Sequence, residues 1–130
     1  MLKTLLLIAA AILALAIILV IWITRDGELI TPEGAGTVTL DAGEFEAYPL
    51  PEYVTEVLPE GYKSYLVEVE SGIKIHVLEV GTGYPVYLQH GNPTSGLLYR
   101  KVADRLPTER MRLIMPTMVG LGFSSKIPVS

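Results

Sequence analysis

The sequence predicts an α/β fold preceded by a single transmembrane helix. Three observations predict it: a long apolar segment at the amino terminus, two alternating segments typical of a β-hairpin, and a strand, turn, helix and strand after them. Hairpin, strand, helix and strand in this order are the opening of an α/β sheet. We expect three parts, namely a transmembrane signal anchor (1–24), an acidic Gly- and Pro-rich linker (25–61) and the first part of an α/β domain (62–130).

Composition excludes several classes of protein. The 130 residues include no cysteine and carry a formal net charge of −4. Without cysteine the chain has no disulfide framework, no thiol nucleophile and no Cys-ligated metal site. An acidic chain also lacks the basic footprint that phosphate backbones require, so we expect no nucleic-acid partner.

The amino-terminal segment is long enough to cross a bilayer. Leu5 to Ile23 are 19 uninterrupted apolar residues, and a helix of that length measures about 28 Å, close to the hydrocarbon thickness. Residues 21–26 offer no small-x-small cleavage site, which favours an uncleaved signal anchor that contacts lipid through Leu2–Ile23. A secretory signal cleaved within the Ala-rich stretch is the alternative. Both interpretations place the remaining chain on the extracytoplasmic side, and Lys3 adds a small bias in that direction.

An acidic segment separates this helix from the rest. Between residues 26 and 62 there are nine acidic residues and no basic one, whereas from Lys63 onward basic residues outnumber acidic ones, eight to five. Repeated Gly and Pro in the acidic segment predict an extended, poorly helical spacer. We therefore place the boundary of the following domain near Gly61.

The first elements of that domain are β-strands. Residues 64–70 and 73–77 alternate apolar and polar side chains on either side of Ser71-Gly72, which predicts a hairpin. His76 is expected to face solvent on its second strand. Residues 86–88 form a short apolar run, typical of a strand that is buried on both faces of a parallel sheet.

A helix and a further strand follow. Thr94 or Ser95 is expected to cap a helix that continues to Leu106, with Leu98, Val102 and Leu106 on its apolar face. Residues 112–115 predict the next strand, and a Gly-rich turn follows it.

The turn between residues 90 and 95 has the composition of an anion site. Ligand sites in α/β sheets lie at the carboxyl ends of the strands. There Gly91 permits close approach to the backbone, Pro93 fixes the chain path, and Asn92 can donate hydrogen bonds from its N–H and its carboxamide. An oxyanion or halide cradle is one interpretation, and from spacing alone an ordinary turn is the other.

Two motifs resemble a known family. Residues 83–95 resemble the α/β-hydrolase superfamily, and their core H-G-N-P-T-S is similar to that of the haloalkane dehalogenases. Residues 116–126 resemble the loop P-D-x-x-G-x-G-x-S after the family's next strand, except that Thr117 stands at the usual Asp position. Tyr99 likewise stands where the dehalogenases commonly have Trp. The resemblance covers Tyr62–Pro128.

The resemblance implies roles for the turn. Asn92 would be the catalytic contributor, supplying one oxyanion-hole N–H and one of two hydrogen bonds to a leaving halide. His90, Gly91 and Pro93 would form the structural turn of the site, and the peptide bond before Pro93 is expected to be cis. His90 is not expected to be the catalytic base, because the family's base lies far downstream. The class uses no cofactor, and we expect neither a cofactor nor a metal.

Three further polar residues are assigned to the scaffold. Ser124 and Ser125 lack the spacing of a nucleophile elbow and are interpreted as loop residues. Asp104 is expected to form an exposed ion pair with the neighbouring Arg100 or Arg105.

The sequence therefore predicts the amino-terminal portion of a membrane-anchored α/β hydrolase. It resembles a haloalkane dehalogenase that hydrolyses a small substrate through a covalent intermediate. In this fold the nucleophile, acid and base would follow Lys126, so the 130 residues alone are expected to be inactive. A serine esterase or lipase, or an epoxide hydrolase of the same fold, is an alternative. A noncatalytic, membrane-tethered interaction protein is another, if the chain ends at Ser130.

Overall fold

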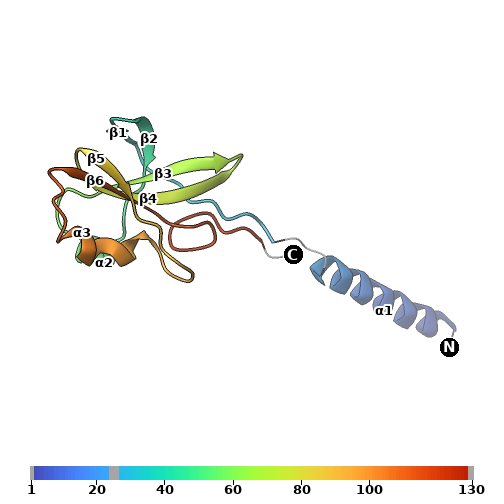
Figure 1. Cartoon of the computed structure of the whole chain (residues 1–130). Coiled ribbons are helices and arrows are strands. Elements are labelled where there is room, and N and C mark those ends of the chain that lie inside the picture. The colour runs from blue at the N-terminus through green and yellow to red at the C-terminus, as the bar shows by residue number, and fades with distance from the viewer. Residues whose placement is uncertain (1, 24–26, 129–130) are drawn as a thin grey trace. The chain divides into compact units, whose positions relative to one another are not determined.

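The computed structural model describes residues 2–23 and 27–128 (Figure 1). The chain divides into two compact units, one that contains helix α1 (Leu2–Ile23) and one that spans Leu29–Ile127. Residues 24–26, which include the end of the predicted anchor, lie outside the described residues.

Helix α1 confirms the predicted amino-terminal helix. Its segment Leu6–Ile23 has 18 residues with a mean hydropathy of 3.2 and is not buried within the protein. By length and composition this helix could cross a membrane, a test that a signal sequence near the amino terminus also passes.

The second unit is built on a six-stranded sheet with the strand order β1-β2-β3-β4-β6-β5. Four neighbouring pairs are antiparallel, and β5 and β6 are parallel. The strands are β1 (Thr37–Leu40), β2 (Gly43–Ala47), β3 (Lys63–Glu70), β4 (Ile73–Gly81), β5 (Tyr84–Tyr87) and β6 (Met111–Pro116).

Strands β3 and β4 confirm the predicted hairpin. They pair along most of their length, with an irregularity between Glu68 and Glu70. Gly72 forms the turn at a φ of 76°, a left-handed conformation that a side chain disfavours. The sequence pattern predicted this alternation of side chains between the two faces of the sheet.

The segment expected to be a spacer contributes to the sheet. β1 and β2 form a hairpin, and β2 pairs with β3 through Glu46 opposite Leu66 and Ala47 opposite Tyr65. A short helix, α2 (Glu52–Thr55), follows. The structure thus differs from the predicted extended linker over 25–61, because the apolar residues of β1 and β2 alternate and bury one face despite the acidic composition around them.

Strand β5 lies at the edge of the sheet. Tyr84 and Tyr87 are exposed in the described part of the chain, which differs there from the expectation of a strand buried on both faces. The reason is its position, because among the described residues β5 pairs only with β6.

The helix after β5 is shorter than predicted, and a different face of it packs against the sheet. A 3₁₀ turn, η1 (Gly96–Tyr99), leads into α3 (Arg100–Ala103), and neither Thr94 nor Ser95 caps it with its side chain. Leu98 and Val102 are exposed, which corrects two positions of the predicted apolar face, whereas Leu106 packs against the core cluster as expected. Gly96 and Ala103 are buried instead, because a 3₁₀ start has three residues per turn and shifts the face that meets the sheet.

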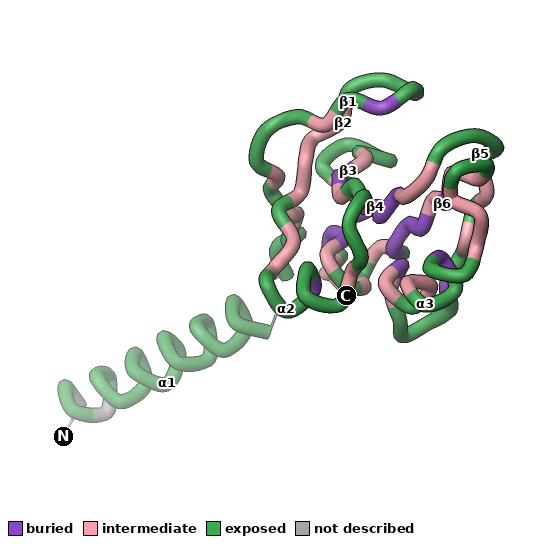
Figure 2. Tube along the Cα trace, turned by 90° about the vertical axis from the view of Figure 1, so that its left-hand side faces the viewer, coloured by how far each residue is buried: buried purple, intermediate pink, exposed green. Residues whose placement is uncertain are grey.

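Two apolar clusters lie on opposite faces of the sheet. Figure 2 marks buried residues on β3, β4 and β6. Adjacent residues of a strand point to opposite faces, so Leu78 joins one cluster and Val77 the other. The first cluster includes Ala103 of α3, and the second includes Leu40 of β1. The helix therefore covers one face, and the β1–β2 hairpin covers the other (Figure 1).

Candidate functional site

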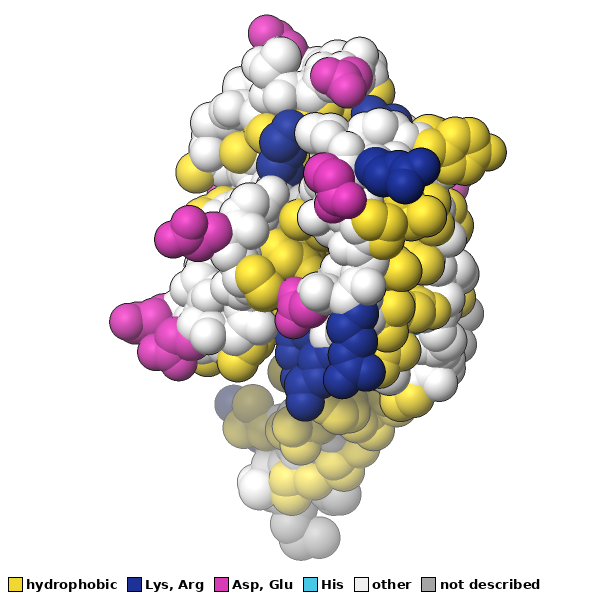
Figure 3. Space-filling view, turned by 60° about the vertical axis from the view of Figure 1, so that its left-hand side comes forward, with side chains coloured by type: hydrophobic (Ala, Val, Ile, Leu, Met, Phe, Trp, Pro, Cys, Tyr) yellow, Lys and Arg dark blue, Asp and Glu magenta, His cyan; other side chains and the backbone are white. Residues whose placement is uncertain are grey.

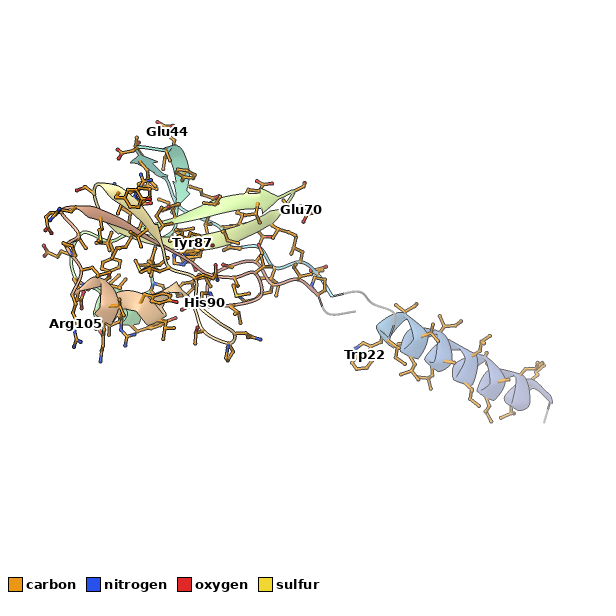
Figure 4. All side chains as sticks on the ribbon, in the orientation of Figure 1. Trp22, Glu44, Glu70, Tyr87, His90 and Arg105 are labelled. Atoms are coloured by element: carbon orange, nitrogen blue, oxygen red, sulfur yellow. The ribbon has the colours of Figure 1, made fainter. Side chains whose placement is uncertain are left out.

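The candidate site lies where the two parallel strands end. β5 and β6 run in the same direction, so the loop 88–95 after β5 and the loop 117–126 after β6 leave from the same edge of the sheet. Figure 4 shows Tyr87 on β5 and His90 just beyond it. This is the position predicted for the anion-binding turn.

His90 joins the two loops. Its ring is buried, with 3% of the residue exposed. The backbone N–H of Met118 donates to Nε2 over 3.0 Å, and Nδ1 lies 2.8 Å from the carbonyl oxygen of Gly91. An N–H donor requires Nε2 to be the unprotonated acceptor, so Nδ1 carries the proton and donates to Gly91. Both ring nitrogens are therefore engaged by backbone groups.

A second contact fixes the other end of the turn. The N–H of Gly96 donates to Oγ1 of Thr117 over 3.1 Å, and Thr117 is 1% exposed. A Cβ at Gly96 would lie 2.4 Å from the carbonyl oxygen of Met115, so only glycine fits there. The turn from His90 to Gly96 is consequently attached at both ends to the first two residues after β6.

Asn92 lies exposed between these two attachments. No hydrogen bond of its side chain occurs within the described part of the chain, and its peptide bond to Pro93 is cis, as expected. Its two chain neighbours apart, no described residue has an atom within 4 Å of the place where a Cβ of Gly91 would stand. The space beside the Cα of Gly91 and the carboxamide of Asn92 are thus open to a ligand, whereas the Gly91 carbonyl oxygen accepts hydrogen bonds from His90 and Thr94.

A shallow depression begins beside Asn92. Its volume is about 340 Å³ and it is open to solvent. The lining residues come from the turn, from η1 and α3, and from the loop after β6: Pro93, Thr94, Ser95, Leu97, Leu98, Arg100 and Gly122.

Tyr99 supports the start of the same turn. Its hydroxyl donates to the carbonyl oxygen of Gln89 over 2.5 Å, and the hydroxyl of Tyr87 donates to Oε1 of Gln89 over 2.8 Å. The residue at the family's usual Trp position therefore contacts the backbone directly before His90.

Ser124 and Ser125 attach the second loop to β4. Oγ of Ser124 donates to the carbonyl oxygen of Thr117 over 2.7 Å and accepts the N–H of His76 over 2.9 Å. Oγ of Ser125 accepts the N–H of Lys74 over 2.9 Å. Both serines are buried loop residues.

His76 corrects one expectation. It is buried rather than facing solvent, and its ring packs edge-on against Tyr48 and Phe123. Ser64 donates its hydroxyl proton to the carbonyl of Tyr48, so the 2.9 Å contact with His76 requires Nε2–H to donate to Ser64 Oγ. Burial lowers the pKa of His76 to about 4.

The predicted ion pair of Asp104 is not formed. Among the described residues, no ion pair joins Asp104 to Arg100 or Arg105. Arg100 instead donates to the carbonyl oxygen of Leu97, since the helix turn brings that carbonyl within 3.2 Å.

Sequence reasoning missed a buried polar cluster on the sheet. The hydroxyl of Tyr65 donates to Oε2 of Glu79 over 2.8 Å, and Nε of Arg112 lies 4.0 Å from Oε1. Burial, followed by this hydrogen bond, raises the pKa of Tyr65. Its three residues lie on three strands, and no spacing along the chain indicates them. In residues 2–23 and 27–128, no group of three His, Asp or Glu side chains could hold a metal ion.

The chain is similar to haloalkane dehalogenases in sequence. It is 42% identical over 67 residues to the haloalkane dehalogenase of Agrobacterium fabrum (strain C58), covering 52% of this chain and 21% of that protein. It is 42% identical over 53 residues to haloalkane dehalogenase 2 of Mycobacterium tuberculosis, covering 41% of this chain and 18% of the relative. No family model matches the chain.

The fold is also similar to a solved dehalogenase. The haloalkane dehalogenase of Agrobacterium tumefaciens C58 matches with a TM-score of 0.52 and 38% identity, over 57% of this chain and 25% of that chain. The chain thus resembles an amino-terminal portion of the haloalkane dehalogenases, and its mixed sheet with helices fits the start of an α/β hydrolase. It spans about a fifth of the length of the curated relatives.

Proposed function

We propose that this chain is the amino-terminal portion of a membrane-anchored, haloalkane-dehalogenase-like hydrolase. One observation carries the proposal: the turn holding Asn92 is attached at both ends to the loop after β6, while the Asn92 side chain itself is exposed. A rigidly held turn with free donors suits the binding of developing negative charge. The similarity to haloalkane dehalogenases supports the same reaction class.

Asn92 is the proposed catalytic residue. Its backbone N–H would stabilise an oxyanion, and its carboxamide would donate one hydrogen bond to a leaving halide. The open space at Gly91 allows a reacting atom to approach the backbone. The substrate would be small, and the reaction would proceed through a covalent intermediate that water hydrolyses.

His90, Gly91 and Pro93 are proposed to be the structural turn of the site. With Nε2 accepting from Met118 and Nδ1–H donating to Gly91, His90 has no free nitrogen with which to act as a base. The nucleophile, acid and base are proposed to follow Lys126, as they do in this fold. Residues 1–130 alone would then be inactive.

Helix α1 is proposed to be a signal anchor in residues 1–24. Its length and hydropathy support this role, and the catalytic part would lie on the extracytoplasmic side. Retention of the cellular protein in membranes after an alkaline carbonate wash would support the anchor. Release by that wash, or a mature protein lacking α1, would contradict it.

The test of the proposed function is the identity of the whole product. Reading the gene past codon 130 and measuring the intact mass of the cellular protein would establish its carboxyl terminus. We expect a further strand and a G-x-D-x-G elbow, as a dehalogenase requires. A G-x-S-x-G elbow would indicate an esterase or lipase, and a product ending at Ser130 would indicate a noncatalytic, membrane-tethered protein.

A further inference from the structure

The segment η1–α3 has exposed apolar and basic side chains on the side turned away from the sheet. Leu98 and Val102 are 51% and 47% exposed, and Lys101 and Arg105 are exposed beside them. Backbone hydrogen bonds extend the helical turn beyond α3 to Leu106. The four residues are spaced i, i+3, i+4 and i+7, so they lie on one face of the helical turn. We call them the outer face of α3.

Within the described residues, the outer face contributes nothing to the core clusters. Gly96 and Ala103 are the buried residues of this segment, and they lie on the side that packs against the sheet. The apolar pair that the sequence pattern assigned to the core is therefore turned toward solvent. Figure 3, which brings the α3 side of the sheet forward, shows Lys and Arg side chains directly beside hydrophobic ones.

The charge of the outer face favours an anionic partner. Residues 96–106 contain three basic side chains and one acidic, Asp104. Asp104 lines a separate depression with Tyr62, away from the outer face. In Figure 4, Arg105 lies on the side of the sheet that α3 covers. Glu44 lies on the β1–β2 hairpin, on the other side. Aliphatic side chains next to long cationic ones match the interface of an anionic bilayer, where the apolar groups enter and the cations contact headgroups.

We propose that the outer face of α3, formed by Leu98, Lys101, Val102 and Arg105, docks on the headgroup region of an anionic lipid membrane. The inference rests on the proposed membrane anchor, because a tether raises the local concentration of the bilayer at this face. Leu98 also lines the depression beside Asn92. Docking thus brings the candidate site to the membrane surface, which favours substrates that partition into lipid.

The absence of cysteine makes a direct test possible. The full chain carrying Leu98→Cys is labelled with an environment-sensitive fluorophore and reconstituted into vesicles of phosphatidylcholine, with or without phosphatidylserine. Thr39→Cys is the matched control, since Thr39 is exposed on the hairpin that covers the opposite face of the sheet. Quenching by nitroxide-labelled lipids is then measured for both labels.

We expect several-fold stronger quenching and a blue-shifted emission at position 98 in vesicles with phosphatidylserine, and neither at position 39. The double variant K101E/R105E, or high salt, should abolish the difference. Equal quenching at both positions in chains that resist carbonate extraction would overturn the docking face while leaving the anchor intact. A blue shift of the label at position 98 that grows with protein concentration in detergent, without lipid vesicles, would also overturn the proposed membrane docking. It would indicate that a second copy of the chain covers this face.

Discussion

The backbone N–H of Met118 donates a hydrogen bond to Nε2 of His90 over 3.0 Å. This contact joins the loops after two parallel strands and sets the tautomer of a buried imidazole. Together with the bond from Gly96 to Thr117, it holds the turn that carries Asn92. The site is therefore rigid around one exposed carboxamide.

Replacing His90 should loosen this turn. His90→Phe leaves the N–H of Met118 without its acceptor, and we expect a loss of about 1–2 kcal/mol in the free energy of unfolding. Tyr87→Phe is the control. The one hydrogen bond of the Tyr87 hydroxyl within the described residues is to the exposed side chain of Gln89, so this substitution should cost less than about 0.5 kcal/mol. Denaturant unfolding of the full chain in detergent micelles measures both. Equal stabilities of the two variants would contradict the role of His90.

Thr117 should act through its hydroxyl. Thr117→Val keeps the shape but removes the acceptor of the Gly96 N–H, which should cost about 1–2 kcal/mol and speed hydrogen exchange at Gly96. Thr117→Ser retains the hydroxyl and should preserve slow exchange at that amide. If the Gly96 amide exchanges at the same rate in the Thr117→Val and Thr117→Ser variants, the hydrogen bond from Gly96 to Thr117 does not hold the turn.

Two glycines of the same turn should differ strongly in their response to alanine. A Cβ at Gly96 would meet the Met115 carbonyl oxygen at 2.4 Å, so Gly96→Ala should destabilise the protein by about 1–3 kcal/mol or more, as overpacking of a core site does. Gly91→Ala meets no atom within 4 Å and should change stability by less than about 1 kcal/mol. Thermal unfolding measures the stability of the two alanine variants. Similar transition temperatures would contradict the close packing of Gly96 against Met115.

Stability should depend on pH through His76. Burial holds its folded-state pKa at about 4, below the ordinary value of 6.5, so the unfolded chain binds the proton more tightly. The stability contributed by neutral His76 is complete above pH 6.5 and is lost as the pH falls toward 4. His76→Gln retains a donor for Ser64 and does not titrate.

The measurement is the free energy of unfolding of both chains across that range. The wild-type chain should lose up to about 1.4 kcal/mol per pH unit more than the variant. Carboxylates titrate in both chains and cancel in the comparison. Parallel pH profiles would show that His76 is not buried in its neutral form.

Local pattern predicted the elements whose side chains alternate without interruption. The β3–β4 hairpin and the turn at Gly72 follow from such alternation. The β1–β2 hairpin carried the same signal, with Val38 opposite Phe45 and Leu40 in the same cluster, but acidic and glycine residues around it obscured the pattern.

Long-range contacts account for what the sequence could not predict. The 3₁₀ turn begins at Gly96, which packs closely on Met115, a contact that periodicity along the chain does not predict. The buried environment of His76 likewise depends on Phe123, a residue that the fold brings from a distant loop. The position of Asn92 could be predicted because its turn lies in the loop after a strand, whereas the partners of His90 could not.

Halide release by the complete gene product tests the central proposal most directly. The wild-type enzyme should release halide from short haloalkanes, and Asn92→Ala should lower kcat by about 10² to 10³ while leaving stability unchanged, since its side chain forms no hydrogen bond within the described residues. A folded wild-type enzyme that releases no halide, or an Asn92→Ala variant that turns over as fast as wild type, would contradict the proposed dehalogenase-like site.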